Sequence, residues 1–135
     1  MKKLLLFLSV VPQLAGCADT SEPHPCDPLA TKETRALYAA LFRTARCGIL
    51  FGHQDDALYG HDWHFEPGRS DVRDCCGDYP AVFGWELGGM DLGAERSIDD
   101  VPFDLIARRL IEAAGRGAVN TVSWHPSNPE TGGSA

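Results

Sequence analysis

Polar side chains gather at the ends of three strand-like runs, and they are the residues of this sequence best suited to chemistry. The run GILFG leads into HQDD at residues 53–56, AVFGW leads into Glu86, and NTVSW leads into His125. Carboxylates can act as acids, bases or nucleophiles, and an imidazole can donate to or accept from a hydroxyl group. The sequence therefore predicts a site for a polar molecule, built from groups that several strands supply.

Short apolar runs predict the strands that position these groups. We expect strands at Ile49–Phe51, Ala81–Trp85 and Asn120–Trp124. Polar residues do not alternate regularly in them, and a helix separates the second from the third, which is typical of parallel strands buried on both faces. The carboxyl ends of parallel strands share one edge, where (β/α)₈ barrels and doubly wound sheets both place their sites. The pattern predicts an α/β fold and leaves both architectures open.

Helices are predicted around these strands. The first begins near Thr31 and ends at Gly48, and a second is capped by one of the aspartates at 99–100 and ends at residues 115–117. Apolar residues recur at helical spacing in the second helix: Phe103, Ile106, Ala107, Leu110, Ile111 and Ala114. Residues 57–78 are polar, and a connection of that length predicts a functional loop.

The N-terminus has the pattern of an export signal. Two lysines precede an apolar run at residues 4–11, which is shorter than the roughly 20 residues of a membrane-spanning helix. The sequence LAGC at residues 14–17 resembles the bacterial lipobox. It predicts a lipoprotein signal peptide at residues 1–16 and a lipid on Cys17 that tethers the exported protein to a bacterial membrane or cell surface. An ordinary secreted protein is the alternative, and residues 17–33 are expected to form a tether or N-terminal arm.

Charge and cysteine content narrow the class of partner. The formal charge is −7, and loss of the two lysines in residues 1–16 takes it to −9, which argues against nucleic acid and is compatible with a neutral sugar. Export predicts disulfides, with three possible pairings of four cysteines. Zinc binding near the HDWH segment lacks a CxxC pair, and we expect no metal or cofactor. The cysteines in question are Cys26, Cys47, Cys75 and Cys76.

Three motifs together resemble a known family. GILFGHQDD at residues 48–56, FGWELGG at 83–89 and NTVSWHPSNPETGGSA at 120–135 resemble the N-terminal part of glycoside hydrolase family 26, whose best-known members are β-mannanases. The resemblance implies that residues 34–135 are an incomplete domain, about three strands of a truncated (β/α)₈ TIM barrel. It also implies retaining, endo-acting hydrolysis of a polysaccharide such as mannan, glucomannan or galactomannan.

The resemblance also implies roles for single residues. It places His125 in the active-site cleft against the sugar, and His53 is a second candidate for substrate binding. Trp124 is either an aromatic platform for the sugar or, by strand alternation, a core residue. Trp63 in the long loop is a further candidate platform. Glu86 is either a catalytic acid or an acid that holds a neighbouring histidine or amide, and the family pattern favours the second role.

The same resemblance implies that the catalytic groups lie elsewhere. Retaining glycosidases use two carboxylates about 5–5.5 Å apart. In this family they are glutamates of the fourth and seventh strands, so we expect both to lie beyond Ala135. A fragment without them is expected to be inactive and to fold poorly. The alternative function is that of a non-catalytic glycan-binding surface lipoprotein.

Overall fold

The computed structural model describes residues 23–133, and the described chain divides into two units after Arg46. The predicted signal peptide and Cys17 lie outside the described residues. None of the helices within residues 23–133 is long and apolar enough to cross a membrane. In the first unit, helix α1 spans Lys32–Ala45, and the side chain of Thr31 caps it by accepting from the Thr34 amide at 3.2 Å. The predicted start of this helix is confirmed, and its end lies before Gly48.

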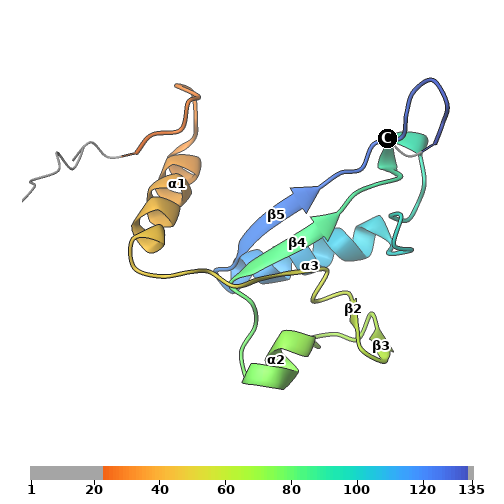
Figure 1. The fold of residues 1–135 in the computed structure, drawn as a ribbon, viewed down its shortest axis with the longest axis horizontal. Helices are drawn as coiled ribbons and strands as arrows, with labels where there is room; N and C mark the ends of the chain where they lie inside the picture. Colours follow the sequence, from red (N-terminus) through yellow and green to blue (C-terminus); the bar gives the residue numbers. More distant parts are fainter. Residues whose placement is uncertain (1–22, 134–135) are drawn as a thin grey trace, which may run out of the picture. The chain divides into compact units, whose positions relative to one another are not determined.

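A three-stranded parallel sheet forms the centre of the second unit (Figure 1). Its strands are β1 (Gly52–Gln54), β4 (Val82–Glu86) and β5 (Val119–Ser123), in the order β1-β4-β5. Both neighbouring pairs are parallel. The predicted parallel α/β fold is therefore confirmed, with the central strand carrying Glu86 at its carboxyl end.

Helix α3 (Phe103–Gly115) packs on one face of this sheet. Phe83 and Trp85 point to that face and stack with ring centroids 5.6 Å apart. They belong to the same buried cluster as Ile106 and Ala113 of α3. Because side chains alternate along a strand, Gly84 and Glu86 point to the opposite face, which α3 does not cover.

The first strand lies further along the chain than predicted. Ile49 is 97% exposed, and β1 begins only at Gly52. The carbonyl of Phe51 accepts from the amides of Ala81 and Val82, at 3.0 and 3.2 Å, so the ladder with β4 starts there. Hydrogen-bond partners on β4, and not the apolar run, therefore fix where β1 begins.

The segment predicted as a loop at 57–78 has secondary structure of its own. Strands β2 (Tyr59–Gly60) and β3 (Trp63–His64) pair as a hairpin, and helix α2 spans Asp71–Cys76. Trp63 is 2% exposed, and its indole nitrogen donates to Asp71 at 2.6 Å. Trp63 therefore connects the hairpin to α2, and its burial is at odds with a sugar platform.

The helix before β5 differs from its prediction in the residue at which it begins and in the side chains that it buries. Asp100 has a left-handed backbone (φ 61°), and Pro102 occupies the N-cap position, so α3 begins at Phe103. A short 3₁₀ helix, η1 (Met90–Leu92), precedes this turn. Ile111, expected on the apolar face, is 69% exposed. The buried residues of α3 are Ile106, Arg109 and Ala113.

Candidate functional site

The carboxylate of Glu86 is buried at the carboxyl end of β4 and is surrounded by donors. Its Oε1 accepts from the Gly88 amide at 2.5 Å, and its Oε2 accepts from the Ser123 hydroxyl at 2.7 Å. The end of β5 and the turn after β4 therefore both bind the same carboxylate. This arrangement holds the two strand ends together and fixes the orientation of Glu86.

His125 completes the set of groups around Glu86. Its Nδ1 lies 2.7 Å from Glu86 Oε2, and its backbone amide donates to Oε1 at 3.3 Å. A carboxylate only accepts, so Nδ1 carries a proton, and in the neutral form of the ring Nε2 is then an acceptor. The His125 side chain is 72% exposed. The Glu86–His125 pair thus presents an oriented imidazole to solvent.

Hydrogen bonding decides the charge of Glu86. Burial by itself would raise the pKa of this carboxyl, but hydrogen bonds from Ser123, Gly88 and His125 together hold the pKa below its usual value. Glu86 is therefore a carboxylate at neutral pH. Both of its oxygens already accept two hydrogen bonds each. These contacts match the expected role of holding a neighbouring histidine, and they leave no oxygen free for general acid catalysis.

His53, the second predicted substrate-binding histidine, lies on the other face of the sheet. β1 pairs with β4 so that His53 is opposite Phe83, which points toward α3. Its Nδ1 lies 3.0 Å from Oδ1 of the buried Asp56, and its side chain is 44% exposed. The structure therefore does not bring His53 together with the Glu86–His125 pair.

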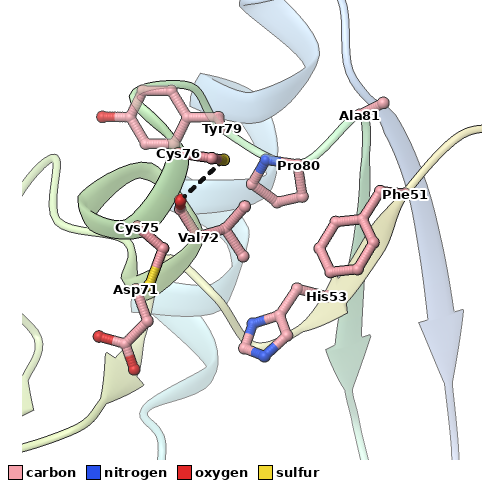
Figure 2. A pocket seen from close by; sticks show the side chains of 9 residues that line it. All are labelled: Phe51, His53, Asp71, Val72, Cys75, Cys76, Tyr79, Pro80 and Ala81. Atoms are coloured by element: carbon pink, nitrogen blue, oxygen red, sulfur yellow. Dashed lines mark hydrogen bonds between the residues drawn. The ribbon is translucent and has the colours of Figure 1, made fainter.

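His53 instead lines an open cavity of about 610 Å³ beside α2 (Figure 2). Most of the lining is apolar, and two neighbouring thiols of α2 contribute to it. Figure 2 shows the imidazole of His53 among these lining side chains, with Val72 and the two cysteines on the neighbouring helix. The lining residues are Phe51, His53, Asp71, Val72, Cys75, Cys76, Tyr79, Pro80 and Ala81.

Trp124 points away from His125, as strand alternation predicts, yet it is not a core residue. It is 57% exposed and lines a second open hollow of about 440 Å³ with Leu87, Met90 and Val122. At the rim, Asp91 accepts from the Ser127 amide at 2.9 Å. This hydrogen bond is the main reason that the pKa of Asp91 is lowered. Trp124 thus offers an exposed aromatic face next to the loop that follows His125.

In the sequence, Gln54 and Asp55 stand out only as polar residues that follow the first predicted strand. Asp55 is 1% exposed, and its Oδ2 lies 3.3 Å from both the Gln54 amide nitrogen and the Tyr59 hydroxyl. Burial raises the pKa of Asp55. Burial, followed by the nearby Asp55 and Asp99, raises the pKa of Tyr59 to about 12. The period of two along β1 predicts that His53 and Gln54 point to opposite faces, and the register against β4 shows that Gln54 is the one on the face of Glu86.

The cysteines and the HDWH segment form no compact cluster. All four cysteines of the described chain are exposed and free, so it contains none of the expected disulfide pairings. His61 is 88% exposed and has its Nδ1 3.1 Å from Asp62. Within residues 23–133, no three His, Cys, Asp or Glu side chains are grouped so that they could hold a metal ion.

Comparison with known proteins gives the family. The model of glycosyl hydrolase family 26 matches residues 26–134. A mannan endo-1,4-β-mannosidase of Bifidobacterium adolescentis is 35% identical over 112 residues, which are 78% of this chain and 11% of that protein. The chain thus spans about a ninth of the length of this relative.

Solved structures support the same family. A family 26 β-mannanase from Bacteroides ovatus matches with a TM-score of 0.76 and 44% identity, over 78% of this chain and 31% of that one. An endo-β-1,4-mannanase from Cellulomonas fimi matches with a TM-score of 0.63 and 37% identity, over 78% and 24%. The family model covers most of the sequence, and the fold agrees with family structures. The chain therefore belongs to glycoside hydrolase family 26.

Proposed function

We propose that this chain is the N-terminal, substrate-holding part of an endo-acting enzyme that hydrolyses β-1,4-mannan with retention of configuration. One observation carries the proposal: the buried Glu86 orients the exposed imidazole of His125 at the carboxyl ends of parallel strands. That edge is where α/β enzymes place their sites. The mannanases among the relatives support mannan as the substrate.

The proposal assigns binding and bond cleavage to different parts of one polypeptide. The chain corresponds to 31% of the Bacteroides ovatus mannanase. We infer that the complete enzyme, meaning this chain together with the rest of a (β/α)₈ barrel, supplies two carboxylates about 5–5.5 Å apart. Glu86 is not one of them, because hydrogen bonds occupy both of its oxygens. His125 is proposed to hold the sugar unit next to the bond that is cut.

The chemical steps follow from retention. One carboxylate attacks the anomeric carbon while the other, as a carboxylic acid, protonates the leaving glycosidic oxygen. The second group then removes a proton from water, which displaces the first carboxylate and releases the sugar. His125 contributes by accepting a hydrogen bond from a sugar hydroxyl at Nε2, since its Nδ1 donates to Glu86.

The test is the stereochemistry of hydrolysis by the complete enzyme. We expect it to shorten β-1,4-mannan chains internally and to release β-anomers first, observed by proton NMR before mutarotation. Release of α-anomers would contradict retention, and failure to cleave mannan while cleaving another β-glycan would contradict the proposed substrate.

We also propose that the protein is exported and held at a bacterial membrane or cell surface by a lipid on Cys17. The basic start and the LAGC sequence at residues 14–17 support this localisation. We expect Cys17→Ser to abolish labelling by a radioactive fatty acid and to release the protein from membranes, whereas Cys26→Ser leaves both unchanged. Equal labelling of the two variants would rule out the anchor.

A further inference from the structure

Gln54 lies on the same face of the sheet as Glu86, although the two belong to different strands. β1 pairs with β4 so that Gln54 is opposite Gly84, and paired residues of parallel strands share a face. Glu86 follows two positions later on β4 and is paired with Ser123 of β5. The face that α3 leaves uncovered therefore carries both Gln54 and the Glu86–His125 pair.

Gly84 leaves the space that the Gln54 carboxamide occupies. A Cβ at position 84 would collide with the side-chain oxygen of Gln54. Since Gly84 belongs to the neighbouring strand, this contact shows that the carboxamide reaches across β4. The carbonyl of Gly84 also accepts from the Asp55 amide at 2.9 Å, which ties the end of β1 to the same point.

Asp55 sets the orientation of that carboxamide. Its Oδ2 lies 3.3 Å from Nε2 of Gln54, and a carboxylate accepts hydrogen bonds, so the amide nitrogen faces Asp55. Asp55 itself is 1% exposed and also accepts from Tyr59. Gln54 is an exposed residue, and its side chain makes no other hydrogen bond within residues 23–133. Its second N–H and its Oε1, which lies over Gly84, are therefore unpaired there.

We propose that Gln54 contacts the substrate and binds two adjacent hydroxyl groups of one sugar unit, with Asp55 as its positioning residue. A carboxamide offers one donor and one acceptor side by side, which is what a pair of neighbouring hydroxyls requires. The proposal rests on the proposed function, because it takes a β-glycan to occupy this face of the sheet. The sugar would then be bound by two residues, Gln54 on β1 and His125 after β5.

Two substitutions at position 54 in the complete enzyme test the contact. Gln54→Ala removes the side chain, and Gln54→Met keeps its length over Gly84 but cannot form the hydrogen bonds. We expect both to lower kcat/KM on β-mannan about 10-fold, which is the size of one or two lost hydrogen bonds. Both should weaken calorimetric binding of a β-1,4-mannan oligosaccharide similarly. Wild-type kcat/KM in Gln54→Met would show that the side chain only fills space, and would overturn the proposal.

The role of Asp55 has its own test. Asp55→Asn places an amide beside Gln54 and lets the carboxamide of Gln54 rotate, so this single variant should have a lower kcat/KM than wild type. When Gln54→Met is already present, adding Asp55→Asn should lower kcat/KM no further. If the fold-losses in kcat/KM of the two single variants multiply in the double variant, the positioning role of Asp55 is overturned. A wild-type enzyme that binds no β-glycan would contradict the proposed function. If the wild-type enzyme hydrolyses β-mannan and Gln54→Met does so equally well, only the role of Gln54 is contradicted.

Discussion

Replacing His125 with alanine in the complete enzyme is expected to lower kcat/KM on β-mannan about 100-fold. The substitution removes the acceptor that Nε2 offers to the sugar. It also removes the hydrogen bond that Nδ1 donates to the charged, buried carboxylate of Glu86. Hydrogen bonds to charged groups contribute about 1.5–3 kcal/mol each, which corresponds to roughly 10- to 150-fold in rate. Initial rates on mannan over a range of concentrations measure the effect.

The controls separate loss of function from loss of fold. His61→Ala is a matched change at a histidine that is 88% exposed and has only Asp62 within ion-pair distance, so its kcat/KM should equal that of wild type. Circular dichroism of His125→Ala should be unchanged, because most of this side chain lies in solvent. Wild-type kcat/KM in His125→Ala would contradict the proposed contact with the sugar.

The strand ends of the site could be predicted from sequence because local pattern determines them. Apolar runs that end in Glu86 and His125 place both groups at the carboxyl edge of parallel strands, whatever the rest of the fold. The alternation along the third strand also predicted that His125 and Trp124 point in opposite directions. These features depend on the backbone period alone, so they do not require knowledge of distant contacts.

Features that depend on distant partners could not be predicted. His53 and Gln54 are neighbours of similar polarity, and only the register against β4 shows which of them shares a face with Glu86. The burial of Trp63 follows from Asp71, eight residues away on α2, which the sequence did not identify as its partner. Likewise, the exposure of Trp124 reflects which elements cover it, and strand alternation does not specify them.

Replacing Glu86 with alanine should have the largest effect on stability, a loss of about 3 kcal/mol in the free energy of unfolding. It leaves the Gly88 amide, the Ser123 hydroxyl and the His125 amide without their acceptor. A buried donor that loses its partner costs about 1–3 kcal/mol, and solvent reaches part of this group of donors, so the costs do not add fully. Urea unfolding of the complete enzyme, compared with the exposed-site variant Glu95→Ala, measures the difference.

Glu86→Gln separates the structural role of this side chain from its effect on His125. A glutamine can still accept from Gly88 through Oε1, and its amide nitrogen can donate to His125 Nδ1 if the imidazole adopts the other tautomer. Stability should then fall by less than in Glu86→Ala, while Nε2 becomes a donor and kcat/KM on mannan decreases. Nitrogen NMR shifts of the imidazole report the tautomer. Unchanged tautomer and wild-type activity in Glu86→Gln would show that Glu86 does not orient His125.

The pH dependence of stability gives a further measure of the same carboxylate. The pKa of Glu86 is lowered in the folded protein, so its charged form stabilises the fold at pH values above its unfolded pKa, near 4.5. That contribution is lost as the pH falls through the lower, folded pKa. Glutamine at position 86 does not titrate, so the stability advantage of wild type over Glu86→Gln should be constant at neutral pH and shrink in acid. A difference that stays constant down to pH 3 would mean that the hydrogen bonds of Glu86 do not favour its charged form.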